Sequence, residues 1–175
     1  MPAQALSPSA PEGVLPLSAL APQALETLLG PFGLVVIWIE DATPIPGSYW
    51  GEREAGLQGD TLLVRRDTPV HSALHEAGHW LCMDPARRDE LDTDAGGCDN
   101  EESAVCYLQA LMADRLEGFG RLRLFADMDA WGYSFRLGNT QRWFTEDAQD
   151  ALAWLQQHEL VDADGQLTGN KRENP

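Results

Sequence analysis

The sequence predicts a single α+β domain that is predominantly helical and carries a small sheet. Two apolar stretches rich in β-branched residues, 33–40 and 60–66, have the length and composition of strands. Later stretches at 69–83, 100–116 and 146–158 combine helix-capping residues with apolar side chains at helical spacing. With 175 residues, 43% of them hydrophobic, the chain is long enough to bury one core of ordinary size.

The N-terminal part predicts a flexible segment followed by a helix and two strands. Residues 1–17 are rich in Pro, Ala and Ser, so we expect them to be loosely ordered. Ser18 is a suitable N-cap for a short helix that ends at Leu29, before Gly30-Pro31. The stretch 33–40 predicts a buried strand, 60–66 a second strand, and the Pro- and Gly-rich stretch 41–59 a loop between them.

The helix predicted over 69–83 carries the most informative pattern, His75-Glu76-Ala77-Gly78-His79. Thr68 is expected to be its N-cap with Pro69 in the first turn, and Asp84-Pro85 is expected to end it. Two histidines one turn apart on one helix face can bind the same metal ion, with Glu76 beside them facing a bound water. The sequence therefore predicts a metal centre with His75 and His79 as ligands and Glu76 as the catalytic residue.

Gly78, inside this pattern, and His71, one turn before it, have interpretations other than metal binding. Gly78 weakens a helix interior by about 1 kcal/mol, which favours a packing role in which another backbone passes close to the helix. His71 extends the histidine series, but eight residues of helix rise about 12 Å, too far for a shared ion. We therefore expect His71 to be an outer or surface histidine.

A third ligand is expected on the helix predicted over 100–116, which Asp99 or Asn100 can cap. Glu101 begins an apolar stripe on this helix, and a carboxylate on a core-facing stripe is costly unless something pairs with it. A metal ion would be such a partner, so Glu101 is the preferred third ligand. Glu102 points about 100° away from Glu101 around the helix axis and is the reserve candidate for the third ligand. Acidic residues in a first helical turn are also favoured by the helix dipole, without any metal.

The pattern of His75, Glu76 and His79, followed by Asn100-Glu101-Glu102-Ser103-Ala104, resembles the zincin metallopeptidases of the glutamate-ligand type. The resemblance covers about forty residues and implies a zincin-like domain over 18–161. It implies zinc bound by His75, His79 and Glu101, with Glu76 as general base. Tyr133 and His158 are candidates for the transition-state-stabilising residue of such enzymes, although a structural role is the simpler interpretation of each.

A second resemblance is to the bacterial elongation factor P hydroxylases. It rests on His75 to Trp80 and on the segment Ala86-Arg87-Arg88. It implies a non-haem metal, iron, and oxygen-dependent hydroxylation of a modified lysine. Two histidines and a carboxylate suit Fe(II) as well as zinc. Core packing for Trp80 and solvated or carboxylate-paired arginines are the alternative interpretations.

The sequence thus supports three functional hypotheses. In the first, a zinc-dependent hydrolase uses metal-activated water against the carbonyl of a peptide or protein substrate, with Glu76 moving the proton. In the second, the chain is an iron-dependent hydroxylase. In the third, it is a non-catalytic metal-binding module, for which a fourth protein ligand would be the sign.

Composition narrows the possible partners and compartment. The formal net charge is −16, and such an acidic surface disfavours nucleic acid and anionic membranes. The N-terminus lacks a basic segment followed by an apolar run, and the longest apolar run, 34–39, cannot span a bilayer. Three cysteines without a CxxC pair favour reduced thiols, mostly buried as small apolar groups. We therefore expect a cytoplasmic protein, with no prediction of its oligomeric state.

The loop before the second helix of the site and the C-terminal half of the chain allow further predictions. Asp92 or Asp94 could orient a ligating histidine, or only cap an acidic loop. The aromatic-rich stretch 121–144 is expected to belong to the core rather than to a substrate cleft. Thr145 is expected to cap the helix at 146–158, and the polar residues 162–175 to form a frayed tail.

Overall fold

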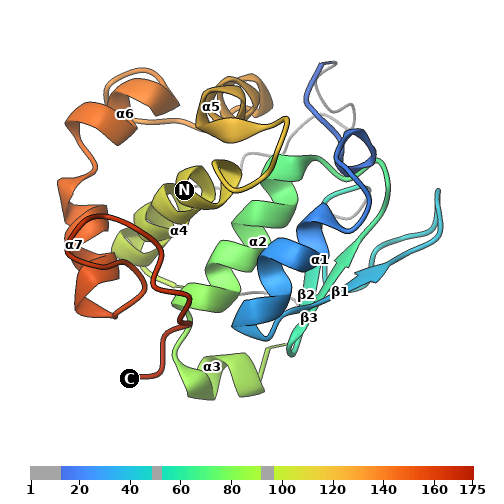
Figure 1. Cartoon of the computed structure of the whole chain (residues 1–175), viewed down its shortest axis with the longest axis horizontal. Helices are drawn as coiled ribbons and strands as arrows, with labels where there is room; N and C mark the ends of the chain where they lie inside the picture. The colour runs from blue at the N-terminus through green and yellow to red at the C-terminus, as the bar shows by residue number, and fades with distance from the viewer. Residues whose placement is uncertain (1–12, 49–52, 92–96) are drawn as a thin grey trace.

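The computed structural model describes residues 13–48, 53–91 and 97–175. Within them helices predominate over one small sheet, which confirms the α+β prediction (Figure 1). The helices in chain order are η1 (Leu17–Ala19), α1 (Ala24–Leu29), η2 (Gly30–Phe32), α2 (Val70–Cys82), α3 (Pro85–Asp89), α4 (Asp99–Ala113), α5 (Gly120–Trp131), α6 (Thr140–Glu146) and α7 (Gln149–Gln157). The strands are β1 (Val35–Trp38), β2 (Gly56–Gln58) and β3 (Thr61–Val64).

The sheet has the order β1-β3-β2, with β1 parallel and β2 antiparallel to β3. The prediction of a continuous loop over 41–59 is wrong, because β2 lies inside it. The amide of Ala55 donates to the Ser72 hydroxyl of α2 over 3.0 Å, which fixes the strand to the helix. A Cβ on Gly56 would come within 2.3 Å of the Pro46 carbonyl oxygen, so this glycine allows a close backbone approach rather than a turn.

The first strand is shorter and more exposed than predicted. The expectation of a buried strand over 33–40 is wrong, since β1 covers four residues and three of them are exposed. Its apolar, β-branched composition predicts a strand correctly but does not reveal its place in the sheet. As an edge strand with one face outside the core, β1 keeps only Val36 packed against the core cluster.

Helix α2 is the central element of the molecule and is buried along almost its whole length. The sheet and α1 lie on one side of α2, and α4 crosses it on the other (Figure 1). A Cβ on Gly78 would lie 2.9 Å from Cγ1 of Val105 in α4, which confirms the packing interpretation of this glycine. The helix begins at Val70 with Pro69 as its N-cap; the predicted cap, Thr68, instead accepts a hydrogen bond from the Arg65 amide.

The described residues at both ends of the chain pack against the rest of the molecule, where the sequence predicts loosely ordered segments. In the N-terminal segment, residues 1–12 lie outside the described residues, but the Leu15 carbonyl accepts from the Val70 amide over 2.9 Å. The tail beyond Asp162 differs from the frayed segment expected, because Leu167 joins the core. Near its end, Arg172 donates from its amide to Leu81 and from its guanidinium to Cys82, both carbonyls at the end of α2. Figure 1 shows this C-terminal segment passing that end of α2.

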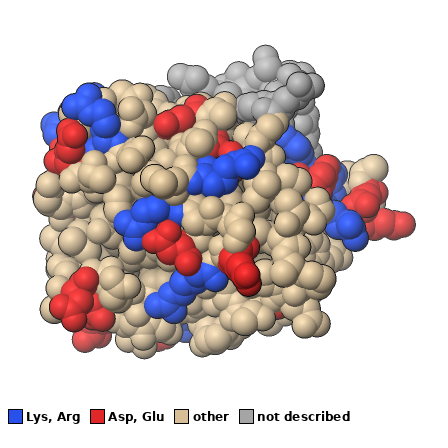
Figure 2. Space-filling model, turned by 45° about the horizontal axis from the view of Figure 1, so that its top comes forward, with Lys and Arg blue, Asp and Glu red and all other residues tan. Residues whose placement is uncertain are grey.

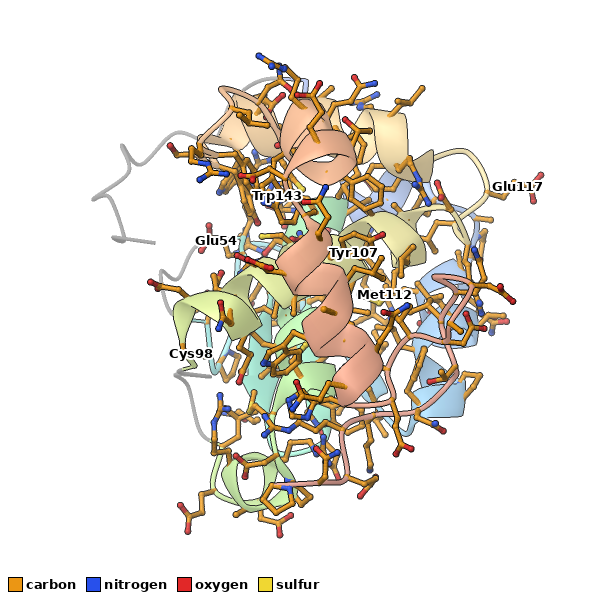
Figure 3. The ribbon with its side chains drawn as sticks, turned by 90° about the vertical axis from the view of Figure 1, so that its left-hand side faces the viewer. Glu54, Cys98, Tyr107, Met112, Glu117 and Trp143 are labelled. Atoms are coloured by element: carbon orange, nitrogen blue, oxygen red, sulfur yellow. The ribbon has the colours of Figure 1, made fainter. Side chains whose placement is uncertain are left out.

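The aromatic-rich stretch forms α5, the following turn and α6. Phe135 stacks on Trp143 with ring centroids 4.8 Å apart, and Phe144 stacks on Tyr107 of α4 at 4.5 Å. Figure 3 shows Tyr107 and Trp143 on the side of the molecule formed by α4, α6 and α7. These contacts confirm the core interpretation. Thr145 lies within α6 rather than capping the last helix, which begins at Gln149.

Charged side chains cover the surface in mixed order. On the face drawn in Figure 2, acidic and basic side chains lie close to one another in several places, rather than forming a single patch of one sign. In the parts of the chain that the structure describes, no helix combines the length and the apolar character that crossing a membrane requires.

Candidate metal centre

Three side chains from α2 and α4 bring their donor atoms together. Nε2 of His75 lies 3.1 Å from Glu102 Oε1, and Nε2 of His79 lies 3.2 Å from Glu102 Oε2. The two Nε2 atoms are 3.1 Å apart. Among the described residues, this is the one group of three or more His, Cys, Asp or Glu side chains whose possible ligand atoms all lie within 4.8 Å of one another. We call it the His75–His79–Glu102 cluster.

The crossing of α2 and α4 produces this arrangement. On α2, His75 and His79 are one turn apart and so share a face. At Gly78 the two helices pack tightly, since a Cβ there would lie 2.9 Å from Val105 Cγ1 and 3.4 Å from the Val105 carbonyl oxygen. Glu102 lies three residues before Val105, about one turn, and therefore points from α4 towards the same face of α2. The absence of a side chain at Gly78 thus lets α4 approach closely enough for its carboxylate to reach both imidazoles.

The structure brings Glu102, and not the preferred candidate Glu101, to the two histidines. Glu101 is only 2% exposed, and its carboxylate accepts two hydrogen bonds from the Arg87 guanidinium at 2.7 and 2.9 Å. Arg172 of the C-terminal segment adds a second cation 3.8 Å away. The expectation that a core-facing carboxylate needs a partner is correct, but the partner of Glu101 is an arginine.

Gln109, which the sequence analysis did not single out, fixes the orientation of His75. Its Nε2 donates to the His71 carbonyl over 2.9 Å, which leaves Oε1 to face His75 Nδ1 at 3.1 Å. An amide oxygen can only accept, so His75 carries its proton on Nδ1 and directs Nε2 towards the cluster. The available signal was a polar residue in the middle of a buried helix, seven positions after Glu102 and therefore on the same face.

His75 and Glu102 favour each other's charged forms. Burial by itself would lower the pKa of His75, but Tyr133, the Cys106 thiol and the Glu102 carboxylate together raise that pKa well above its usual value. Burial would raise the pKa of Glu102, yet hydrogen bonds with His75 and His79 hold it well below its usual range. In the metal-free cluster the carboxylate therefore stabilises a positive charge at His75, the same sign of charge that a cation would supply.

Of the other residues singled out in the sequence, His71 and Tyr133 lie beside His75, whereas His158 has its own partner. His71 is buried, 1% exposed, with Nδ1 3.3 Å from the Tyr133 hydroxyl, so it is an inner packing histidine rather than a surface one. Burial lowers the pKa of His71 to about 3 and raises the pKa of Tyr133 to about 12. The Tyr133 ring also contacts the His75 ring, with centroids 5.7 Å apart. His158 bonds to Asn174 over 2.7 Å, in agreement with a structural role.

Glu76 is half-buried on α2, one residue beyond His75. Nδ1 of His79 is buried and has no hydrogen-bond partner among the described residues.

Asp92 and Asp94, the residues expected to orient a ligating histidine, lie outside the described residues. Of the three thiols, Cys82 and Cys106 are buried as expected, Cys98 is exposed, and all are free.

The residues that carry the hydroxylase resemblance have structural contacts of their own. The Trp80 indole is buried and donates to Asp60 over 3.1 Å. Arg88 donates to the carbonyls of Trp80 and Met83 at 3.3 and 2.8 Å and so caps the end of α2. Arg87 pairs with Glu101. Each of these side chains thus helps to pack the end of α2 against its neighbours.

The donor set fits a zinc ion. Zinc binds imidazole nitrogen and carboxylate oxygen at about 2.0–2.2 Å in tetrahedral geometry, which places its ligand atoms roughly 3.3 Å from one another. The two Nε2 atoms are 3.1 Å apart, which is close to that value, and each lies 3.1 or 3.2 Å from a different oxygen of Glu102. Within the described residues no fourth His, Cys, Asp or Glu side chain completes the group.

Comparison of the chain with protein-family models, with curated proteins and with solved structures found no match in any of the three. The geometry of the His75–His79–Glu102 cluster is therefore the starting point for a functional proposal.

Proposed function

We propose that this chain is a zinc-dependent hydrolase of the HExxH metallopeptidase type, with His75, His79 and Glu102 as ligands. The observation that carries the proposal is the convergence of two imidazole Nε2 atoms, 3.1 Å apart, on the two oxygens of one carboxylate, at 3.1 and 3.2 Å. Two histidines and a carboxylate are a ligand set of catalytic zinc, which keeps one further position for water. A peptide or protein is the proposed substrate, because the HExxH arrangement serves hydrolysis of amide carbonyls. Glu102 replaces Glu101 in the ligand set that the sequence favoured.

The proposed roles of the side chains rest on the HExxH pattern and on the contacts within the cluster. When bound, zinc supplies Lewis acidity, which lowers the pKa of a coordinated water to about 7 and polarises a carbonyl. Glu76 accepts the proton of the attacking water and passes it to the amine nitrogen as the C–N bond breaks. Gln109 holds the His75 ring so that Nε2 remains a lone-pair donor. Three protein ligands, rather than four, leave room for the attacking water.

A two-histidine, one-carboxylate set also suits Fe(II), so an iron-dependent oxygenase is the second candidate. Elemental analysis separates the two. The chain is purified without added metal beside a His75→Ala, His79→Ala double variant, and metals are quantified in both. We expect about one equivalent of zinc, lost in the double variant. One equivalent of iron, with oxygen consumption in an electrode, would support the second candidate instead. No metal in either protein after reconstitution would contradict both.

Catalysis is then tested with Glu76→Gln. The zinc-loaded wild type, Glu76→Gln and the exposed control Glu90→Gln are incubated with a mixture of unstructured peptides, and the products are identified by mass spectrometry. We expect cleavage by the wild type and Glu90→Gln, and a loss of about 100-fold or more in Glu76→Gln with zinc still bound. Cleavage retained in Glu76→Gln would exclude Glu76 as the base, and zinc binding without cleavage in any form would favour a non-catalytic module.

A further inference from the structure

The outer strand of the sheet carries most of the strongly exposed large apolar side chains. Among the described residues four such side chains are exposed: Val35 by 56%, Ile37 by 44%, Trp38 by 42% and Leu122 by 67%. The first three belong to β1, an edge strand in the order β1-β3-β2. An edge strand presents backbone N–H and C=O groups away from its neighbour, so apolar side chains and hydrogen-bonding groups are exposed together.

The apolar side chains of β1 lie on both faces of the sheet. Val35 and Ile37 pair with Thr61 and Leu63 of β3, and Leu63 lies outside the main core cluster. Trp38 pairs with Val64, which belongs to that cluster, and so faces the helical side. A strand added at this edge would alternate its own side chains between these two faces. One set would cover Val35 and Ile37, and the other would lie beside Trp38.

On the helical side, the position beside Trp38 is a groove. It encloses about 700 Å³ and lies between the segment containing η1 and α1 and the end of β1. Figure 1 shows α1 next to this edge of the sheet. Apolar side chains form much of its wall: Leu17, Leu20, Leu25, Trp38 and Ile39. The Trp38 indole donates to Glu26 Oε1 over 2.6 Å, which holds the aromatic ring in the wall of the groove.

The charged residues that line the groove favour a basic occupant. Three acidic residues, Glu26, Glu40 and Asp41, line it, against one basic residue, Arg66. Glu26 Oε2 is buried and has no hydrogen-bond partner among the described residues. A buried carboxylate oxygen is stabilised by a donor, best a charged one. A second copy of a chain with net charge −16 would bring the same acidic residues and be repelled.

We propose that β1 is a docking edge for an extended segment of another protein that carries alternating apolar residues and Lys or Arg. The segment adds to β1 as a further strand. Its apolar side chains cover Val35 and Ile37, and its basic side chains enter the groove towards Glu26. This interaction surface is independent of the metal centre and of the proposed hydrolase activity.

The test uses the whole chain as bait for a displayed library of random 12-residue peptides. We expect the enriched peptides to alternate apolar and basic residues. A synthetic enriched peptide is then titrated against the wild type and against Ile37→Lys, Glu26→Gln and Leu122→Lys by calorimetry. Binding should weaken at least tenfold in Ile37→Lys and at least fivefold in Glu26→Gln. Leu122→Lys, which changes the exposed apolar residue outside β1, should bind as the wild type does.

Three results would overturn the proposal. The first is a library with no enrichment of alternating basic peptides. The second is an enriched peptide whose affinity is the same in Ile37→Lys and Glu26→Gln as in the wild type. The third is a dimer of the wild type in sedimentation that Ile37→Lys converts to monomer, since a second copy would then be the occupant. Circular dichroism of each variant verifies that the fold is retained.

Discussion

Two adjacent glutamates at the start of α4 occupy opposite kinds of environment. Glu101 is held by two hydrogen bonds from the Arg87 guanidinium, a charge-assisted pair. Glu102 faces two imidazoles, which can release their protons and bind a metal ion instead. Because successive residues of a helix point about 100° apart, one residue of register decides between a structural ion pair and a candidate metal centre.

The comparison predicts its largest effect in zinc affinity. Glu102→Gln should weaken zinc binding by about 1000-fold, more than the 10–100-fold typical of residues that only orient ligands, because a ligand itself is altered. Glu101→Gln should change zinc affinity by about threefold or less, since its carboxylate binds Arg87 rather than the histidines. Competition with a chelator of known affinity measures both variants. Equal losses of zinc affinity in the two variants would contradict the assignment of Glu102 as the ligand and Glu101 as the partner of Arg87.

A smaller effect is expected from Gln109, which touches the metal centre only through His75. Gln109→Met keeps the volume but removes the acceptor for His75 Nδ1–H, and should weaken zinc binding about 10- to 100-fold. Gln109→Glu retains the acceptor for His75 Nδ1–H but loses the donor to the His71 carbonyl, so its zinc affinity should lie between those of Gln109→Met and the wild type. Binding in Gln109→Glu as weak as in Gln109→Met would indicate that the acceptor for His75 Nδ1–H does not set the zinc affinity.

The sequence predicted the histidines, the helix that holds them and the meaning of Gly78, because these depend on local spacing along one helix. It favoured the wrong glutamate of the two for the position beside the histidines. The choice depended on where Arg87 lies after α3 has folded, and the spacing of residues along α4 contains no information about α3. The strand β2 was missed for a related reason, since Gly56 is needed for contact with a distant backbone rather than for a local turn.

The two glutamates should also differ in their dependence on pH. In the metal-free chain the folded-state pKa of His75 is raised, despite burial, by Tyr133, Cys106 and Glu102. Its contribution to stability is therefore present below pH 6.5 and is lost as pH rises through the folded pKa, by about 1.4 kcal/mol per pH unit for one proton. Urea unfolding between pH 6.5 and 9 measures this slope. It should shrink in Glu102→Gln and remain in Glu101→Gln; an unchanged slope in both would contradict the assignment.

The smallest expected effect concerns the helix crossing that brings Glu102 to the histidines. Gly78→Ala gains about 1 kcal/mol of helix propensity, but its methyl group would lie 2.9 Å from Val105 Cγ1. Overpacking of this kind costs about 1–3 kcal/mol, so the net result should be a loss of about 1 kcal/mol and weaker zinc binding as α4 moves away.

Val105→Ala supplies the control for that prediction, because it removes the atom that the new methyl group would meet. In the double variant the propensity gain should remain while the overlap disappears. The two substitutions should therefore be non-additive by about 2 kcal/mol, the cost of the overlap, in a double-mutant cycle. Additive free energies of unfolding would mean that Gly78 and Val105 do not set the helix separation. Zinc affinity recovered in the double variant, relative to Gly78→Ala, would link the separation of the two helices directly to the position of Glu102.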